Sequence, residues 1–346
     1  MKSSIFTTIL AAALIAVFGG CAKKDVAEYT DTLTNAFEAL QEAPQEDVAD
    51  AVVAEEDAVE SDTALDTPLE VTFTDALGRE VTVNNPKRVA ILLGSFADVW
   101  NLAGGEITAT VKDAWTSYDL GLSDDVINLG SFMKLDAEQL LAAEPDFVIA
   151  SAGTDSQIEL REVLDGAGIN SAYFDVDNFD DYLEMLDICT KITGQTENYE
   201  KYGTRIAAEI EEQRARTDGS NPSVLFIRAA ASSVKAKGSE GTVGGEILAD
   251  LGCVNIADSD GALLEDLSLE AIVAADPEYI FVTTQGDDTE AALANMEELL
   301  KSNPAWASLS AVQNGNYYEI DKSLYNSKPN ARWAEAYKII ADILYP

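Results

Sequence analysis

Residues 228–246 read RAAASSVKAKGSEGTVGGE and place three cations, Arg228, Lys235 and Lys237, before four glycines at positions 238–245. Guanidinium and ammonium groups bind anions through charge-assisted hydrogen bonds. Glycines let a backbone approach a ligand closely and can open the following helix. Because the whole chain has a formal charge of −40, such a cluster predicts a local site for an anion. The alternative is that these cations are solvated and offset nearby carboxylates.

The composition excludes several kinds of chemistry. With 62 acidic against 22 basic residues, the surface repels phosphates, so nucleic acid is not expected as a partner. The chain has no histidine, which excludes Ser-His-Asp and Cys-His nucleophiles and any His-ligated zinc, manganese or haem site. The sequence contains no recognisable nucleophile elbow, phosphate-binding loop or metal motif. We therefore expect no catalysis, no cofactor and no metal ligated by the protein itself.

The N-terminus has the pattern of a targeting segment. Lys2 precedes an apolar stretch, residues 5–18, that is too short to be a spanning helix of the mature protein. The stretch ends in VFGGC, which resembles the bacterial lipobox, where the cysteine is diacylated and becomes the mature N-terminus. This resemblance implies a signal peptide over 1–20 and an extracytoplasmic protein anchored to a membrane through lipidated Cys21. The alternative is an ordinary secretory signal with a thiol nearby.

The rest of the chain divides by composition into a tether and a folded part. Residues 22–67 hold 14 acidic residues, two lysines and no glycine, which predicts an extended tether over 21–67. From residue 68 onward, Val71 and Phe73, then Val81 and Val83, alternate with polar residues around DALGRE, which indicates two strands and a turn. Buried strands then alternate with helical patterns, as is typical of an α/β fold with mostly parallel sheets.

Two further patterns indicate a bilobal protein. Residues 197–217 keep a helical spacing of apolar residues and predict one long helix. On either side of it, LDAEQLLAAEPDFVIA (135–150) and LSLEAIVAADPEYIFV (267–282) match in register. Each indicates a short helix that is stopped by proline and followed by a buried strand. The repeat predicts two lobes of like construction, joined by the long helix.

These motifs, together with VTFTDALGREVTVNNPKRVAILLGSFADVW and SKPNARWAEAYKII, resemble the substrate-binding proteins of iron–siderophore and cobalamin ABC importers. The resemblance covers about residues 69–346. It implies an α/β fold with two Rossmann-like lobes of mostly parallel sheets, one backbone helix between them and a ligand cleft between the lobes. We accordingly expect an N-terminal lobe over 68–193, a connecting helix over 194–220 and a C-terminal lobe over 221–346.

The ligand site is expected on the loops at the carboxyl ends of the strands, where open α/β sheets bind ligands. Cations would form a wall facing an anionic ligand, and the aromatic residues would hold its flat or apolar part. The predicted ligand-binding residues are Ser95, Phe96, Trp115, Tyr118, Lys134 and Thr154 in the N-terminal lobe, and Arg228, Lys235, Lys237, Gln285, Asn326, Lys328 and Arg332 in the C-terminal lobe.

Two glutamates are expected to bind the transporter. Glu138 and Glu270 occupy equivalent places in the repeated pattern, ahead of Pro145 and Pro277. In the family that the chain resembles, a glutamate at this position on each lobe docks against arginines of the ABC permease. Two carboxylates, one on each lobe, would let the permease sense the geometry of the lobes through ion pairs.

The expected function is that of a lipid-anchored, monomeric component of an ABC importer, which captures an iron(III)–siderophore-type chelate and delivers it to the permease. A corrinoid such as cobalamin stays open as the ligand, and it would depend more on the aromatic residues. Haem also stays open, although without histidine it would need a ligand such as tyrosine. A surface adhesin or sensor on the same fold is the alternative of another class, and it would need neither Glu138 nor Glu270.

Overall fold

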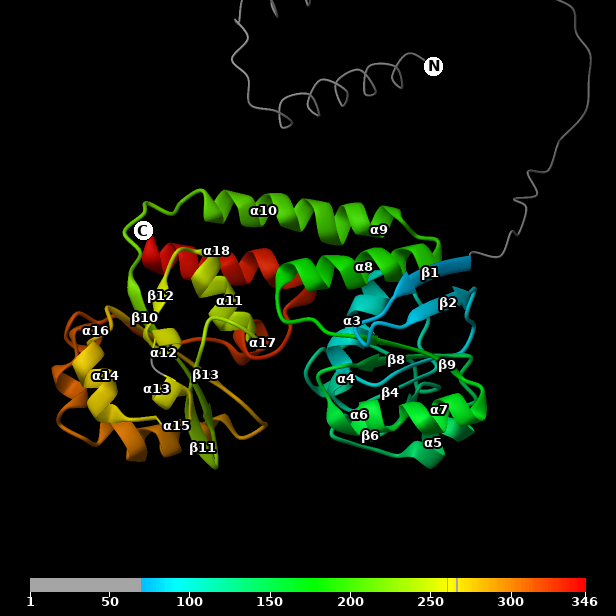
Figure 1. The fold of residues 1–346 in the computed structure, drawn as a ribbon, viewed down its shortest axis with the longest axis horizontal. Coiled ribbons are helices and arrows are strands. Elements are labelled where there is room, and N and C mark those ends of the chain that lie inside the picture. The colour runs from blue at the N-terminus through cyan, green and yellow to red at the C-terminus, as the bar shows by residue number, and fades with distance from the viewer. Residues whose placement is uncertain (1–69, 260, 266) are drawn as a thin grey trace, which may run out of the picture. The chain divides into compact units, whose positions relative to one another are not determined.

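Two five-stranded sheets, each accompanied by helices, make up most of the chain that the structure describes (Figure 1). The structure is a computed structural model, and it describes residues 70–259, 261–265 and 267–346. The predicted signal peptide, lipidation site and tether lie outside these residues. Within these ranges no helix is both long enough and apolar enough to cross a membrane.

The first sheet has five parallel strands in the order β5–β4–β3–β8–β9. They are β3 (Val89–Ile91), β4 (Ala109–Thr110), β5 (Ile127–Asn128), β8 (Phe147–Ser151) and β9 (Asn170–Phe174). Every residue of β3 and β8 is buried, as expected for central parallel strands. The accompanying helices are α3 (Gly94–Leu102), α4 (Asp113–Thr116), α5 (Ala137–Ala142), α6 (Asp155–Glu159), α7 (Arg161–Ala167) and α8 (Phe179–Thr193). We call this sheet and its helices the first lobe.

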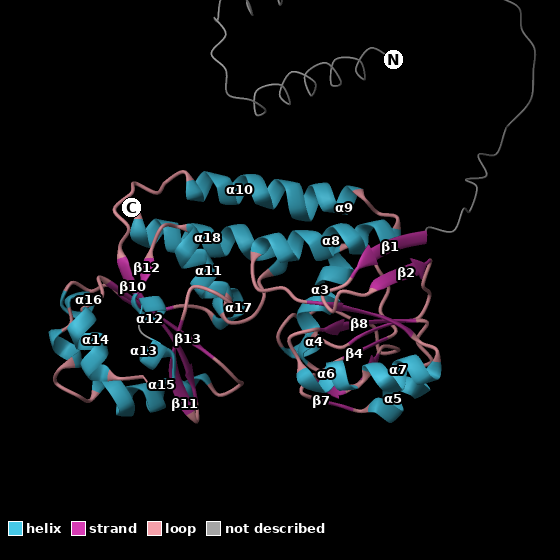
Figure 2. Cartoon of the chain, in the orientation of Figure 1, coloured by secondary structure: helices cyan, strands magenta, loops and turns pink. Residues whose placement is uncertain are grey.

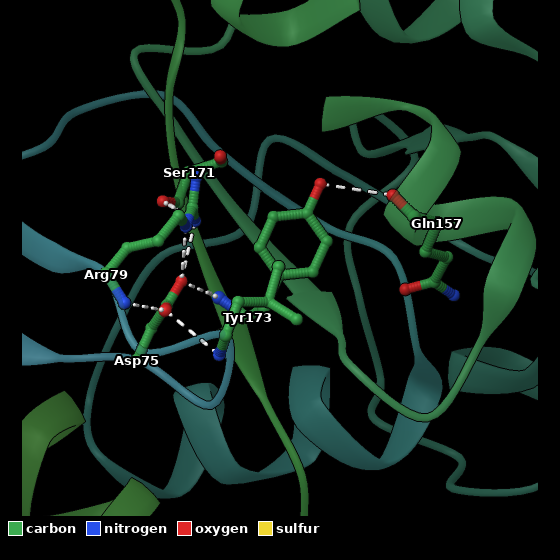
Figure 3. A network of polar contacts seen from close by, with 6 residues as sticks. Asp75, Arg79, Gln157, Ser171 and Tyr173 are labelled. Carbon is green, nitrogen blue, oxygen red and sulfur yellow. Dashed lines mark hydrogen bonds and ion pairs between the residues drawn. The ribbon is translucent and has the colours of Figure 1, made fainter. Parts of the chain in front are cut away.

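Two antiparallel hairpins belong to the first lobe. Strand β1 (Glu70–Thr74) pairs with β2 (Glu80–Asn84), with the predicted apolar residues opposite one another, so the strand–turn–strand prediction is confirmed. Asp75 closes the turn by accepting hydrogen bonds from the Arg79 side chain, and it also accepts one from the backbone N–H of Tyr173 in β9 (Figure 3). The second hairpin, β6 (Gly130–Ser131) with β7 (Lys134–Leu135), follows β5.

The second sheet is mostly parallel and has the order β11–β10–β13–β14, with β12 also paired to β10. Figure 2 draws the strands in magenta and labels β10, β11, β12 and β13 of this sheet. Its strands are β10 (Ser223–Ala230), β11 (Ser233–Lys237), β12 (Val254–Asn255), β13 (Tyr279–Thr284) and β14 (Tyr317–Glu319). Only β11 runs antiparallel to its neighbour in this sheet. The helices are α11 (Val243–Asp250), α12 (Ile256–Ser259), α13 (Gly261–Glu265), α14 (Leu269–Ala275), α15 (Thr289–Met296), α16 (Ser310–Gln313) and α17 (Lys322–Tyr325), with shorter or π-helical turns at Glu297–Lys301, Trp306–Ser308 and Asn330–Arg332. We call this sheet and its helices the second lobe.

Long helices lie along one side of the two lobes (Figure 1). The backbone is helical from α9 (Glu197–Tyr199) through a π-helical turn (Glu200–Thr204) to α10 (Arg205–Arg214), so the long helix predicted over 197–217 is confirmed except for its last residues. In Figure 1 this helical segment lies alongside α8 and the C-terminal helix α18 (Trp333–Leu344). One hydrophobic cluster contains residues of both sheets and of these helices. The two separate sheets with their helices confirm the predicted α/β fold with two lobes.

The repeated sequence pattern has the same local structure in both lobes. Helices α5 and α14 begin at side-chain caps from Asp136 and Ser268. Each of the two helices is followed by an acidic residue whose backbone is in the left-handed conformation, Glu144 with a φ of 47° and Asp276 with a φ of 43°. A buried proline and a buried strand come next in both cases. The match between the two segments therefore extends to individual backbone conformations.

Candidate functional site

Three cations lie on one face of the second sheet. In the antiparallel register of β10 and β11, Arg228 stands opposite Lys235 and Phe226 stands opposite Lys237. Because side chains alternate along a strand, these four residues share a face, and we call Arg228, Lys235 and Lys237 the cationic face. In the described part of the chain, none of the three has a carboxylate oxygen within 4.0 Å. Like charges this close repel one another, so a bound anion would stabilise them.

The pKa values of two residues of the cationic face also favour a bound anion. Burial lowers the pKa of the Lys237 ammonium, and the charges of Arg228 and Lys235 lower it further. Burial also lowers the pKa of the Arg228 guanidinium, whose Nη1 lies 3.5 Å from Asn326 Oδ1. Both shifts mean that the surroundings disfavour positive charge, which an anionic ligand would reverse.

A buried hydroxyl lies beside Arg228 on the neighbouring strand. Thr283 of β13 pairs with Arg228 in parallel register and is 0% exposed. Its Oγ1 has no hydrogen-bond partner in the described part of the chain. Sequence reasoning missed this residue, because a threonine at the end of a buried strand looks like any other β-branched residue.

The glycine-rich loop after β11 borders a cavity of about 600 Å³. Its lining includes Lys237 of the cationic face together with Ser239 and Asp258. Asp258 accepts hydrogen bonds from Ser239 N at 2.8 Å and from Ser239 Oγ at 2.6 Å, which fixes the conformation of the loop. The cationic face and this cavity therefore share Lys237.

The glycines of this loop and of α11 have a packing role. A Cβ atom at Gly244 would lie 2.4 Å from the Phe226 ring, and one at Gly245 would lie 2.1 Å from the Gly238 carbonyl oxygen. Glycine at 244 therefore lets α11 approach Phe226 of β10, and glycine at 245 lets it approach the loop after β11. The atoms approached here belong to the protein, and the predicted close approach to a ligand stays a prediction.

A second cavity, of about 240 Å³, is bordered by both lobes. Its lining includes Asp98 and Tyr118 of the first lobe, and Lys328 and Arg332 from the segment between α17 and α18. The Tyr118 hydroxyl donates to the Lys328 carbonyl at 3.3 Å. Lys328 Nζ lies 3.7 Å from an oxygen of Asp177, which follows β9. The segment before α18 thus contacts the first lobe through both backbone and side chains.

Carboxylates that sequence reasoning did not single out follow the strands of the first lobe. Burial raises the pKa of Asp98 and of Asp113, against opposing hydrogen bonds from Asn330 and from the Gly94 backbone. The pKa of Asp175 is also raised, first by burial and then by the charge of Asp177. These acids carry no sequence signal, because 62 acidic residues are spread over the whole chain. Acids thus follow strands of the first lobe, whereas the cationic face lies on strands β10 and β11 of the second lobe.

A family model described as periplasmic binding protein matches residues 89–324 of this chain. The chain belongs to the periplasmic binding protein family. The family resemblance seen in the sequence is thereby confirmed. This periplasmic binding protein is 25% identical over 261 residues to the Fe(3+)-citrate-binding protein YfmC of Bacillus subtilis, covering 72% of this chain and 78% of YfmC. It is 23% identical over 285 residues to the "Putative ABC transporter substrate-binding lipoprotein YhfQ" of the same organism, covering 77% of this chain and 85% of YhfQ.

Solved structures show the same fold. The periplasmic heme-binding protein RhuT from Roseiflexus sp. RS-1 matches with a TM-score of 0.61 and 20% identity, over 75% of this periplasmic binding protein and 98% of RhuT. The periplasmic heme-binding protein HutB of Vibrio cholerae matches with a TM-score of 0.61 and 22% identity, over 75% of this chain and 99% of HutB. At these identities the comparisons establish the two-lobed fold.

The predicted ligand residues of this periplasmic binding protein fall into four groups. Arg228, Lys235 and Lys237 share one face of the β10–β11 pair, and Asn326 contacts Arg228. Tyr118, Lys328 and Arg332 line the second cavity. Lys134 and Gln285 are exposed, whereas Trp115 and Thr154 are partly buried. Ser95 and Phe96 were expected on a loop, but helix α3 already begins at Gly94 and both side chains are buried. Phe96 packs edge-on against Phe174 in the core, so its ligand contact stays a prediction without support from its position.

Two of the predicted cations are already engaged. Arg332 donates to both carboxylate oxygens of Glu335, at 2.7 and 2.9 Å, and Lys328 faces Asp177. Glu138 and Glu270, the predicted docking residues, are exposed in the first turns of α5 and α14. In the described ranges, no group of three or more Cys, Asp or Glu side chains is placed to hold a metal ion.

Proposed function

We propose that this protein is the extracytoplasmic binding component of an ABC importer, and that it captures an anionic iron(III) chelate without catalysis. The observation that carries the ligand class is the cationic face, where Arg228, Lys235 and Lys237 lack a carboxylate neighbour in the described part of the chain. Carboxylate or catecholate groups of a ferric chelate would supply the missing negative charge. Asn326, beside Arg228, adds a neutral amide that can donate to the same ligand.

Similarity supports the same class of function. The relatives that carry a functional name are an Fe(3+)-citrate-binding protein and a substrate-binding lipoprotein of an ABC transporter. Citrate complexes of iron(III) are rich in carboxylate oxygens, which match guanidinium and ammonium groups. We therefore favour a carboxylate-type chelate and include Lys134, Thr154, Trp115 and Gln285 as further proposed contacts.

Haem is the second candidate, because RhuT and HutB are named as heme-binding proteins. Haem also carries two carboxylates that the cationic face could bind. An iron ligand is harder to find, since the chain has no histidine. Burial, together with the charges of Asp113 and Asp98, raises the pKa of Tyr118, which opposes its ionisation to an iron-binding phenolate. A corrinoid would depend on aromatic contacts, and of these Phe96 is buried in the core.

The proposal includes the transport context. The signal peptide over 1–20, lipidated Cys21 and the tether over 21–67 would hold the binding protein on the outer side of a membrane, as a monomer. Glu138 and Glu270, both exposed at equivalent places in the two lobes, would dock against the permease. If the protein were instead an adhesin or sensor, reversing the charge of these two residues would leave its activity unchanged.

The test is equilibrium dialysis of the full chain in detergent against radiolabelled iron(III) citrate, with a ferric catecholate, a ferric hydroxamate, haem and cobalamin as competitors. We expect competition by anionic ferric chelates and a dissociation constant that rises roughly 10- to 100-fold in Lys235→Ala/Lys237→Ala. The matched control is Lys191→Ala/Lys338→Ala, which removes two exposed lysines from helices α8 and α18. Tight binding of cobalamin or haem that ignores Lys235 and Lys237 would overturn the ligand class.

A further inference from the structure

A side-chain amide interrupts the ladder between the two central strands of the first sheet. Strands β3 and β8 pair in parallel register, with Ile91 beside Ile149, and the Leu92 N–H donates to the Ile149 carbonyl at 2.9 Å. In a parallel ladder, the next bond would run from the Ser151 N–H to the Leu92 carbonyl. Instead, Ser151 N donates to Gln157 Oε1 at 2.8 Å, and Gln157 Nε2 donates to the Leu92 carbonyl at 2.7 Å.

The Gln157 amide therefore stands between the strands as an extra peptide-like group. Its oxygen accepts the hydrogen bond from Ser151 N–H that the Leu92 carbonyl would have accepted. Its nitrogen donates to the Leu92 carbonyl the hydrogen bond that Ser151 N–H would have donated. The strands are thus held apart at their carboxyl ends, although both groups are satisfied. Gln157 is 0% exposed, so water does not compete for these hydrogen bonds.

The position of the interruption is the point where the order of strands reverses. In the order β5–β4–β3–β8–β9, the chain moves from β3 outward to β5 and then returns to β8 and the opposite edge. Ligands of open α/β sheets bind in the crevice outside such a reversal point. Gln157 is inserted between the two strands that border this crevice.

A third loop is attached to the same amide. Gln157 Nε2 also lies 3.4 Å from the Phe132 carbonyl, in the turn between β6 and β7. Lys134 is the first residue of β7, directly after this turn. Ser95 lies in the first turn of α3, which follows β3, and Thr154 lies between β8 and helix α6. The Gln157 side chain thus contacts three segments of the first lobe that lie beside predicted ligand contacts, whereas Trp115 and Tyr118 belong to a further segment at α4, after β4.

Gln157 is itself held from the other side. Its backbone carbonyl accepts a hydrogen bond from the Tyr173 hydroxyl at 3.1 Å (Figure 3). The Tyr173 backbone N–H donates to Asp75, which is paired with Arg79 in the β1–β2 turn. Figure 3 shows this path from the hairpin through the Tyr173 ring to Gln157. This path ties the backbone of Gln157 to β9, whereas its side-chain amide is held by the hydrogen bonds to Ser151 and Leu92.

We propose that Gln157 is a positioning residue of the ligand site, which sets the spacing of the first-lobe loops without touching the ligand. The inference rests on the proposed function, since it takes these strand ends to be the binding site. Without the amide, Ser151 N–H and the Leu92 carbonyl would bond directly or stay unsatisfied. Direct bonding would draw the β3 and β8 loops together by about the width of one amide group. Contacts that need the present spacing would then be lost.

The test compares Gln157→Met, which keeps the side-chain length but has no amide, with Tyr173→Phe, which removes one buried hydrogen bond and leaves the amide bridge intact. Hydrogen exchange of the ligand-free full chain should rise in peptides covering 92–97, 130–134 and 151–157 for Gln157→Met, and it should stay near wild type at 92–97 and 130–134 for Tyr173→Phe. The dissociation constant for iron(III) citrate should rise roughly tenfold in Gln157→Met, as expected when a ligand hydrogen bond is lost, and change little in Tyr173→Phe.

The outcomes separate this proposal from the proposed function. If the wild-type chain binds none of the chelates, the proposed function fails, while the exchange data still report whether Gln157 holds the loops. Unchanged exchange in Gln157→Met overturns the positioning role, and raised exchange with unchanged citrate affinity overturns its connection to the ligand site. If Gln157→Met does not fold, Gln157→Glu replaces it, because glutamate keeps the acceptor for Ser151 and, when ionised, loses the donor to Leu92. Failure of both variants to fold would assign Gln157 to stability alone and overturn the proposal.

Discussion

Asn330, in the turn before α18, donates its side-chain amide to the backbone carbonyl of Ser95 in helix α3 of the first lobe at 2.8 Å. The same nitrogen lies 2.9 Å from Asp98 Oδ2. Asn330 is 0% exposed and has a φ of 50°, a left-handed conformation that asparagine tolerates better than most residues. The C-terminal segment is therefore tied to the first lobe by one buried amide, beside the cavity that Asp98 and Tyr118 line.

We expect Asn330→Ala to lower the free energy of unfolding by roughly 2–4 kcal/mol, because it removes the hydrogen bonds to the Ser95 carbonyl and to the partly buried Asp98 carboxylate and places alanine at positive φ. Asn330→Gly tolerates that φ, so its smaller loss isolates the hydrogen bonds. Urea denaturation measures both values. The control is Asn101→Ala at an exposed site on α3, expected to change stability by at most about 0.5 kcal/mol. If Asn330→Gly were as stable as the wild type, the hydrogen bonds of the Asn330 amide would not stabilise the fold.

The raised pKa of Asp98 predicts how stability depends on pH. Burial raises this pKa above its ordinary value of 3.8, so the folded state holds the proton more tightly than the unfolded state. The contribution of Asp98 to stability is therefore present below pH 3.8 and is lost as the pH rises through the pKa of the folded state. In Asp98→Asn, the decline of the unfolding free energy above this pH should become shallower, by at most about 1.4 kcal/mol per pH unit. Denaturation at a series of pH values measures the slope, and Asp124→Asn, at an exposed site, should leave it unchanged.

Arg228 should contribute more to ligand affinity than its number of hydrogen bonds suggests, because it lies partly buried in the sheet. We expect Arg228→Met to raise the dissociation constant for iron(III) citrate by roughly tenfold or more. Added salt should also weaken binding less in this variant than in the wild type, since one charge no longer takes part. Isothermal titration at two salt concentrations measures both effects. Arg205→Met removes an exposed arginine that pairs with Glu209 on α10, and an equal loss of affinity there would contradict a local role for Arg228.

Charge reversal at the predicted docking residues should separate transport from binding. Glu138→Arg and Glu270→Arg replace exposed carboxylates in the first turns of α5 and α14, so we expect ligand affinity to stay within about twofold of wild type. Uptake of labelled iron by cells should fall several-fold for each variant and further for both together, because arginine would repel permease arginines. Glu290→Arg, in the exposed first turn of α15, is the control. Full uptake by the double variant would favour the adhesin or sensor alternative.

Much of the fold could be predicted from local patterns alone. The alternation of Val71, Phe73, Val81 and Val83 predicted a hairpin, and these residues face one another in the structure. The paired Leu–Glu–Pro patterns predicted two like segments, and the two segments share caps, left-handed residues and buried strands. Such features depend on neighbours within a few residues along the chain, which is why the sequence reveals them.

The composition of the site could be predicted only in part. The grouping of Arg228 with Lys235 and Lys237 follows from a short hairpin, so sequence proximity was a sound guide. Phe96 shows the opposite, because its neighbours along the chain resemble a loop while α3 packs it into the core. Asp98, Asp113 and Thr283 were missed, since nothing local distinguishes them from the many other acids and β-branched residues.

The sequence by itself determined the order of strands and helices, the repeated segments, the absence of histidine chemistry and the place of the cationic cluster, all of which are properties of nearby residues. The tertiary structure alone decided which of the predicted residues are buried, which carboxylates stand beside them, and that Gln157 is inserted between β3 and β8. These outcomes depend on contacts such as Asn330 with Ser95 and Gln157 with Leu92, between residues far apart along the chain. Burial and partner choice are set by the packing of whole elements, and this packing cannot be read from the residues taken in order.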